Sequence, residues 1–297
     1  MTNNPFNYFD LPDSFSYFIP DFWGVYLKIK PALCGNAKIK DLDKIKKICD
    51  KNKLIFGVSN YFFYIDQKTF YKVKTHDYDI DNYAQVFIAR DVKSMDTIKN
   101  NYFEKIVESG ELVLKSENEI RDCGRALGYP DCCIEHLIKC DFHSNLFNAI
   151  YDAYRRSKKI NYLLNNLTPR FYFIPYFPCS YDCQKSLVYA KKISKVIKKF
   201  EPERYRRTVL ELKSLYLSIN YNVGIIFFGK ILKDEIIYSS FLAVGPVEAT
   251  FFKALESGNK CCISEKYVKV KKDDEVIMSI NKIRNDTYFL INFWAGS

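Results

Sequence analysis

Histidine is scarce in this sequence, which has three among its 297 residues: His76, His136 and His143. Because imidazole is the side chain used most often as a general acid or base, this scarcity leaves catalysis by histidine without support. His76 lies in a polar stretch, residues 74–77, where we expect a solvated side chain. The sequence therefore names no catalytic residue and no reaction.

Glycine-rich phosphate-binding loops are absent as well. The glycines of residues 124–128 match neither the Walker nor the Rossmann order, and they fall where a helix is expected to end. Internal repeats, low-complexity linkers and Gly/Ser-rich hinges are also missing. The sequence thus gives no indication of a nucleotide-binding motif or of a repeat architecture.

Long hydrophobic runs are missing too. No apolar run approaches the roughly 18 residues that a membrane span needs, and the run at residues 223–228 is soon followed by Lys230. Residues 1–5 lack the basic-then-apolar order of a signal peptide. We therefore expect a cytoplasmic protein with no membrane partner, in which cysteines are more naturally metal ligands, reactive thiols or core residues than disulfides.

Composition and periodicity predict an ordered α+β protein in three parts. Hydrophobic residues make up 48% and charged residues 27%, which argues against disorder. Residues 1–110 predict a small N-terminal α/β unit that begins with an extended aromatic arm over residues 1 to about 30. Residues 111–217 predict a mainly helical segment with the cysteine motifs. Residues 218–297 predict a strand-rich segment, which alternatively forms one domain with the middle part.

The expected elements follow from apolar spacing and from capping residues. Helices are expected at residues 41–53, 91–108, 116–128, from 131 onward, 145–156, 180–200, from 202 onward and 247–256. Strands are expected at residues 54–58, 61–65, 70–73, 85–89, 170–176, 223–228, 236–241, 267–270 and 276–280.

Two segments each place a pair of cysteines at a predicted helix start. In residues 127–133, Asp131 is the expected N-cap, which puts Cys132 and Cys133 at the first two helical positions. In residues 178–183, Ser180 is the expected cap, with Cys179 just before it and Cys183 three residues into the helix. Backbone N–H groups and the helix dipole lower the pKa of a thiol at such positions.

Two helix starts that converge would bring four thiolates together. Cys132, Cys133, Cys179 and Cys183 then suit either a tetrahedral zinc ion or a four-iron cluster. Adjacent cysteines are awkward ligands for one ion, so one of the first pair is alternatively packed. The reserve ligands are Cys140 and His136, which share a helical face with Cys133. The strand expected at residues 170–176 would place the second pair in a crevice beyond a sheet edge.

Other cysteines fit structural roles. Cys49 and Cys123 lie on apolar helical stripes and are expected in the core. Cys261 and Cys262 are expected at the start of a strand, where successive side chains point to opposite faces. Cys34 precedes a glycine, and its sequence context indicates no particular role.

A basic stripe follows the second cysteine motif. Residues 185–213 hold ten Lys and Arg against three Glu, and the chain as a whole carries a formal net charge of +10. Lys191, Lys195 and Lys198 fall on one side of the predicted helix, opposite an apolar face. A solvated charged face is the simpler interpretation. A surface that binds RNA or another polyanion through these three lysines is the alternative.

The two cysteine motifs resemble those of an uncharacterised prokaryotic, largely archaeal family, domain of unknown function 483. The shared patterns are GYPxCC at residues 128–133 and PCSxxC at residues 178–183, with weaker similarity across residues 224–245. The resemblance implies that the four cysteines belong together, and it gives no activity or substrate. Relatives often have a His shortly before Pro-Cys-Ser, where this chain has Tyr176 and Phe177.

Three hypotheses about function follow. The first is a metal or iron–sulfur centre on the four cysteines, with sulfur transfer or RNA modification as the activity that the basic stripe would suit. The second is a basic nucleic-acid-binding protein whose cysteines are packed and bind no metal. The third is a thiol redox protein.

Overall fold

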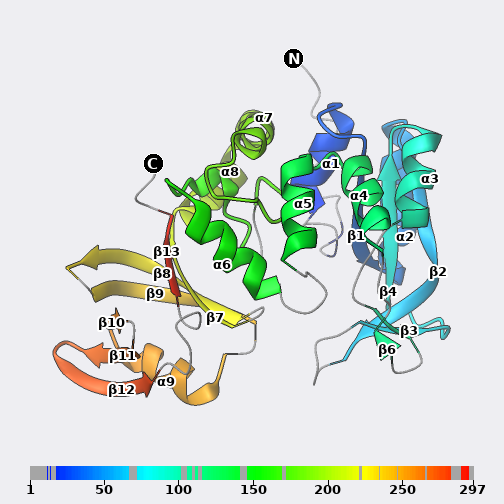
Figure 1. Cartoon of the computed structure of the whole chain (residues 1–297). Helices are drawn as coiled ribbons and strands as arrows, with labels where there is room; N and C mark the ends of the chain where they lie inside the picture. The colour runs from blue at the N-terminus through cyan, green and yellow to red at the C-terminus, as the bar shows by residue number, and fades with distance from the viewer. Residues whose placement is uncertain are drawn as a thin grey trace. The chain divides into compact units, whose positions relative to one another are not determined.

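The computed structural model describes residues 12, 14, 18–66, 72–101, 106–108, 111–112, 116–140, 146–168, 172–220, 223–233, 235–245, 247–264, 266–281 and 289–293. They form an α+β protein, as predicted, and the chain divides into two compact units (Figure 1). The first unit comprises residues 1–139 and 195–200, and the second comprises residues 140–194 and 201–297. None of the described helices combines the length and apolar character needed to cross a membrane.

The α-helices are α1 (Ile19–Tyr26), α2 (Leu42–Lys51), α3 (Val92–Asn101), α4 (Glu117–Ala126), α5 (Asp131–Lys139), α6 (Leu146–Arg156), α7 (Gln184–Phe200), α8 (Pro202–Leu212) and α9 (Ala249–Ser257). The strands are β1 (Ala32–Lys38), β2 (Ile55–Ile65), β3 (Lys72–Thr75), β4 (Tyr83–Ala89), β5 (Ile106–Glu108), β6 (Glu111–Leu112), β7 (Leu215–Asn220), β8 (Val223–Leu232), β9 (Glu235–Val244), β10 (Lys260–Ile263), β11 (Tyr267–Lys272), β12 (Glu275–Asn281) and β13 (Phe289–Asn292). Two 3₁₀ turns, η3 (Ile39–Asp41) and η4 (Tyr162–Leu164), complete the set.

The first unit is built on a six-stranded sheet in the order β1-β4-β2-β3-β5-β6. Strand β4 pairs antiparallel with both β1 and β2, so these two strands run parallel and α2 connects them. Apolar residues of β1 and β4 form one cluster with α3 and α4, and the cluster includes the buried Cys123. Helix α2 buries Ile45 and Cys49, as its apolar spacing predicts.

The N-terminal arm was predicted wrongly. Helix α1 forms where extended chain was expected, because Pro20 is favourable in a first helical turn and its aromatic and aliphatic neighbours are buried. Trp23 is 2% exposed and stacks on Phe200 at a ring-centroid distance of 4.8 Å. Within the arm expected over residues 1 to about 30, residues 1–11, 13 and 15–17 lie outside the described residues.

Two further elements of the first unit differ from expectation. The helix expected at 91–108 ends at Asn101, and β5 occupies residues 106–108. The strands expected at 54–58 and 61–65 are one strand, β2, whose register with β4 shifts between Val58 and Phe62. Such a bulge bends a strand without ending it, which is why the apolar pattern resembles two short strands.

Helix α4 ends at a left-handed glycine. Gly128 has φ +76°, a conformation that costs a residue with a Cβ about 1–2 kcal/mol. The Tyr129 N–H donates to the Gly124 carbonyl and the Gly128 N–H to the Arg125 carbonyl, each at 2.9 Å. This pair of bonds is the Schellman pattern, which satisfies the last carbonyls of a helix and reverses the chain.

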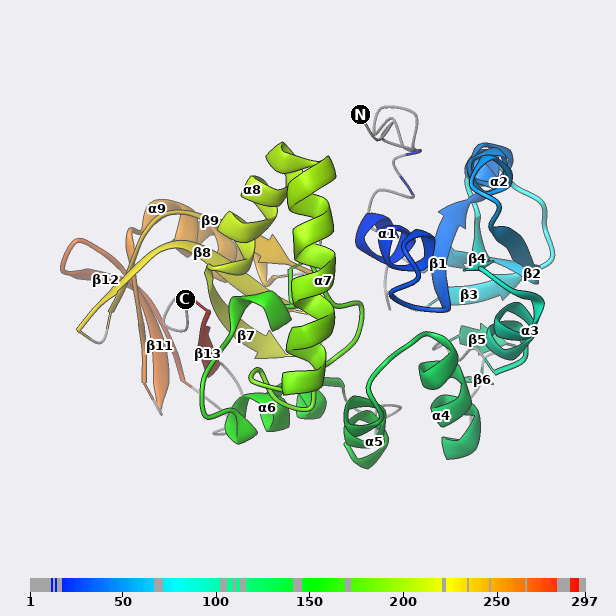
Figure 2. The same ribbon diagram turned by 90° about the horizontal axis from the view of Figure 1, so that it is seen from above.

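The second unit is built on a seven-stranded sheet in the order β12-β11-β10-β9-β8-β7-β13. Alternate residues of β7 face opposite sides. Leu215, Leu217 and Ile219 join the cluster that α9 covers, whereas the buried Tyr216 belongs to the other face. Figures 1 and 2 show α9 on one face of this sheet and α6 with α8 on the other.

The strand expected at 170–176 does not form in residues 172–176, the part of it that the structure describes. Residues 172–178 have no regular structure, and prolines at 175 and 178 remove two of the N–H donors that a ladder needs. The segment is held instead by side chains: the Asn166 amide donates to the Tyr176 carbonyl at 3.0 Å, and the Phe173 ring lies 6.1 Å from Tyr205. The predicted crevice beyond a strand end therefore has no basis.

Replacing Gly128 with Ala should destabilise the protein by about 1–2 kcal/mol, because Ala resists the left-handed conformation. A Cβ at this position would also lie 2.9 Å from the Lys30 Cβ. Chemical denaturation measures the loss. The matched control is Gly57→Ala in β2, where the nearest atom is the sulfur of the flexible Met95 side chain at 3.1 Å. Equal stability of the two variants would contradict the prediction.

Candidate metal centre

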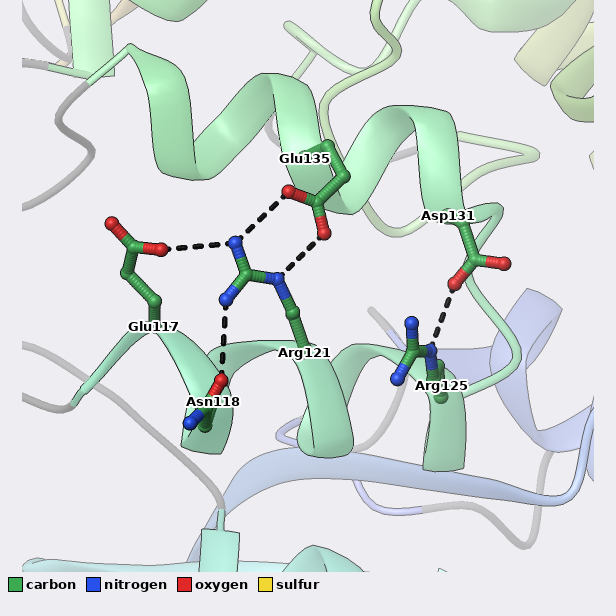
Figure 3. Close-up of polar contacts among 6 residues, drawn as sticks. All are labelled: Glu117, Asn118, Arg121, Arg125, Asp131 and Glu135. Carbon is green, nitrogen blue, oxygen red and sulfur yellow. Dashed lines mark hydrogen bonds and ion pairs between the residues drawn. The ribbon is translucent and has the colours of Figure 1, made fainter.

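The first cysteine motif lies on α5, and ion pairs hold this helix against α4 (Figure 3). The Arg121 guanidinium donates to both oxygens of Glu135, at 2.7 and 3.0 Å, and also to Glu117 at 2.9 Å. Arg125 donates to Asp131 at 2.9 Å. The guanidinium of Arg121 lowers the pKa of the Glu135 carboxyl below its ordinary value of 4.5. A bidentate Arg–carboxylate pair fixes orientation as well as distance.

Close packing beneath these ion pairs leaves little freedom for α5. Gly124 on α4 faces Ile134, and a Cβ on the glycine would lie 2.7 Å from the end of that side chain. Upstream, Tyr129 lies under the ammonium of Lys30, which is 5.4 Å from the ring centroid and forms a buried ion pair with Asp21. The turn that precedes the cysteines is thus held by the packing of α4 on α5 on one side and by Lys30 on the other.

Helix α5 begins one residue earlier than predicted. Asp131 is its first residue and not its cap, so Cys132 and Cys133 are the second and third helical residues. The Cys133 N–H donates to the Pro130 carbonyl at 2.9 Å. The Asp131 carboxylate pairs with Arg125 and thereby anchors the helix start.

The second cysteine motif is anchored by the residues between its cysteines. Tyr181 is fully buried and packs edge-on against Phe293, with ring centroids 5.1 Å apart. Its backbone N–H donates to the Ser157 hydroxyl at 2.6 Å, and its carbonyl accepts from the Asn161 N–H at 3.0 Å. The Asp182 carboxylate accepts from the Lys158 N–H at 3.0 Å. The loop is therefore fixed to the segment that follows α6.

Cys183 occupies the N-cap position of α7, not the interior position that was predicted. The helix starts at Gln184, and the Cys183 carbonyl accepts its first hydrogen bond, from the Leu187 N–H at 2.9 Å. Ser180 lies one turn earlier, where its carbonyl accepts from the Cys183 N–H at 3.1 Å. Because the turn from Ser180 to Cys183 precedes α7, Cys183 lies at the N-terminus of the helix, next to its first N–H groups.

The four cysteines of the two motifs form one group, as predicted. The sulfur atoms of Cys132, Cys133, Cys179 and Cys183 all lie within 4.8 Å of one another, close enough to hold a metal ion. The sulfurs of the adjacent pair, Cys132 and Cys133, are 4.0 Å apart, and both belong to the group. Cys133 and Cys183 are buried, and the other two are half-buried.

The two reserve ligands belong to a different group. The ligand atoms of His136 and Cys140 lie within 4.8 Å of each other and of an Asp152 oxygen. His136 is 2% exposed, whereas Cys140 and Asp152 are half-buried. Burial, followed by the negative charge of Asp152, raises the pKa of the Cys140 thiol. Asp152 was missed because a carboxylate on a helix, with an arginine four residues later, reads as an ordinary surface ion pair.

Three other cysteines that were expected in structural roles are buried. Cys49 and Cys123 are fully buried. Cys261 is buried in the β10 strand, and desolvation raises its pKa to about 12. Its neighbour Cys262 is half-buried on the opposite face, where its thiol donates to Glu235 at 3.0 Å.

The basic stripe is exposed. Lys191, Lys195 and Lys198 all lie on the solvent side of α7, and Ile193 and Ile197 on the other side are buried. The predicted amphipathic helix is therefore present. Exposure agrees equally with a solvated face and with a polyanion-binding surface.

Comparison with known proteins gives no relative from which a function could be transferred. No protein-family model matches the chain. No curated protein and no solved structure matches it either. The resemblance of the cysteine motifs to domain of unknown function 483 stays a prediction, and the candidate site rests on its own geometry.

Acid should weaken the docking of α5. Because its pKa is lowered in the folded protein, Glu135 contributes stability that is fully present above the ordinary glutamate pKa and is lost as pH falls through the folded pKa. The variant Glu135→Gln should be less stable at neutral pH and show a shallower loss of stability in acid. Denaturant unfolding from about pH 7 to about pH 2 measures this. Glu256→Gln, at an exposed position of α9, should follow the wild-type curve; identical curves for all three proteins would refute the role of the pair.

Proposed function

We propose that this chain is a metal-binding protein whose four motif cysteines hold one metal ion as thiolates. The observation that carries the proposal is the approach of four sulfur atoms, from two separate segments, to within 4.8 Å of one another. Free cysteines that serve only as small apolar core residues have no reason to gather in fours. Four thiols are the ligand number of a closed tetrahedral site.

The size of the group supports a single ion. A zinc–sulfur bond is about 2.3 Å long, so two sulfurs on one ion are at most about 4.6 Å apart. The sulfurs of the present group lie within 4.8 Å of one another, so they need to approach by at most about 1 Å to close tetrahedrally on an ion. A four-iron cluster attaches each cysteine to a different iron, which spaces the sulfurs more widely. Zinc is therefore the first candidate and an iron–sulfur cluster the second.

Charge supports the same assignment. A divalent ion with four thiolates keeps a net charge of −2, which helix N-termini stabilise through their N–H groups and dipole. Cys132 and Cys133 lie in the first turn of α5, and Cys183 caps α7. A buried thiolate without such compensation would be costly, so the ion and the helix N-termini together would stabilise the charged forms of Cys133 and Cys183. Four protein ligands leave no open position, which is typical of a structural centre.

Elemental analysis of anaerobically purified protein tests the proposal. The wild-type protein should be colourless and contain zinc, and Cys133→Ser or Cys179→Ser should lower the zinc content by about one equivalent. Cys262→Ser is the matched control, since this half-buried thiol lies outside the group. It should leave the zinc content unchanged.

Other outcomes are equally informative. A brown protein with visible absorption would replace the single ion by an iron–sulfur cluster, and sulfur transfer or RNA modification would then be the activity to assay. Metal-free wild-type protein would reject the proposal and leave packed cysteines or thiol redox chemistry. Rapid formation of a disulfide between the motifs would distinguish the redox hypothesis.

RNA binding is a second candidate, favoured by the exposed lysine stripe on α7. Replacing Lys191, Lys195 and Lys198 with Gln should weaken RNA binding by roughly tenfold or more at low salt. The slope of log affinity against log salt concentration should also become less negative by about 2–3, because three phosphate contacts are lost and each contact releases about one counterion. Fluorescence anisotropy with a labelled RNA over a salt series measures both quantities.

The control variant must lose the same number of positive charges at another place on the surface. Lys44, Lys46 and Lys47 are exposed on α2, and replacing these three lysines with Gln removes three positive charges outside the stripe. Equal weakening in both triple variants would mean attraction to net charge alone. No measurable affinity of the wild-type protein for RNA would leave the stripe as a solvated face.

A further inference from the structure

A second group of metal-ligating side chains follows the cysteine pair along α5. His136 lies four residues after Cys132, and Cys140 lies four residues after His136, directly beyond the last residue of the helix. Residues spaced by four occupy one face of a helix, about 6 Å apart along its axis. The third member, Asp152, comes from α6, and the Cys140 sulfur lies 3.9 Å from its Oδ2 atom.

We propose that His136, Cys140 and Asp152 bind a divalent transition-metal ion with one coordination position left open. Their ligand atoms, one nitrogen, one sulfur and one oxygen, all lie within 4.8 Å of one another. The proposal is independent of the four-cysteine centre, because the two groups share no ligand.

The donor set selects the class of ion. Magnesium and calcium prefer oxygen ligands, whereas a mixed imidazole and thiolate set suits zinc(II), iron(II) or cobalt(II). On binding, the Cys140 thiol releases its proton to solvent and its sulfur forms the bond to the metal. The thiolate and the carboxylate then offset the charge of the divalent ion, so the occupied site is neutral. Neutrality matters here because His136 is buried and a net charge beside it would be poorly solvated.

Arg156 accounts for the orientation of the carboxylate. Its Nε atom donates to Asp152 Oδ2 at 2.7 Å, one helical turn along α6. A carboxylate has two oxygens with about four lone-pair sites, so this bond is compatible with metal ligation. Hydrogen-bonded carboxylates are common supports of metal sites. Arg156 is therefore a positioning residue in this proposal and not a ligand.

A comparable thiol elsewhere in the chain shows what is special about the group. Cys262 also contacts a carboxylate, Glu235, which pairs with Lys271 at 2.7 Å. That arrangement has the thiol, the carboxylate and the cation, but no histidine among the described residues belongs to it. The imidazole nitrogen of His136 supplies the third ligand that turns a hydrogen-bonded pair into a coordination set.

Three protein ligands leave a tetrahedral ion one position for water or another exchangeable small ligand. The four-cysteine group has no such position. If a bound molecule is exchanged or activated on this chain, the inference places that event at the His136 group and assigns the four cysteines to structure.

Cobalt(II) titration of the full-length protein after metal removal tests the inference. The wild-type protein should take up about two equivalents, with thiolate-to-cobalt absorption and the visible bands of a tetrahedral ion. Asp152→Asn and Cys140→Ser, at half-buried positions that tolerate near-isosteric changes, should each take up about one equivalent less. Cys262→Ser and His76→Asn, outside the group, should match the wild type. Circular dichroism confirms that each variant is folded.

The outcomes separate the two sites. Wild-type uptake in both Asp152→Asn and Cys140→Ser would overturn the inference, whatever happens at the four cysteines. If the four-cysteine centre alone failed, wild-type protein would bind about one equivalent, Cys179→Ser would keep it and Asp152→Asn would lose it. The variant His136→Asn tests the third ligand. Loss of one cobalt equivalent with intact folding supports ligation by the imidazole, whereas unchanged cobalt uptake shows that His136 is not a ligand.

Discussion

The reversal of the chain at Gly128 is the constraint on which the first cysteine motif depends. A glycine with φ +76° ends α4, and two backbone hydrogen bonds close the turn. Pro130 then offers its carbonyl to the first N–H groups of the next helix. The helix α5 therefore starts directly after this turn, at Asp131, and the two thiols fall in its first turn. The positions of the cysteines are thus a consequence of backbone geometry several residues earlier.

Neither cysteine motif relies on its sulfurs to hold its shape. Tyr181, not a cysteine, anchors the second loop, and the Arg121–Glu135 pair anchors α5. In both motifs the fixed residues surround the thiols and are satisfied by packing or by hydrogen bonds. In the proposed metal site each motif would be preorganised, because the cost of ordering its side chains is met by folding rather than by metal binding.

The sequence predicted those features that depend on local signals. Ser116 and Glu119 form a reciprocal cap, Gly128 ends α4 and Pro202 opens α8, each where a local rule places it. The grouping of the four cysteines was also predicted, from two similar motifs at helix starts. Features that depend on distant partners were missed. Residues 172–178 form no strand because prolines interrupt the ladder, and Asp152 joins His136 only through the fold.

The buried pair of Asp21 and Lys30 has a consequence for how the chain can vary. Both side chains are almost completely inaccessible, at 3% and 2% exposure, and each neutralises the other. Loss of one partner alone would leave a buried, uncompensated charge, at a cost of about 3–5 kcal/mol, whereas an apolar pair of similar volume can be neutral. Natural variation at these two positions should therefore be correlated: the acid and the base are inherited together or replaced together. The Lys30 ammonium also lies over the Tyr129 ring. Replacing the pair would therefore remove a contact to the turn that precedes Cys132 and Cys133.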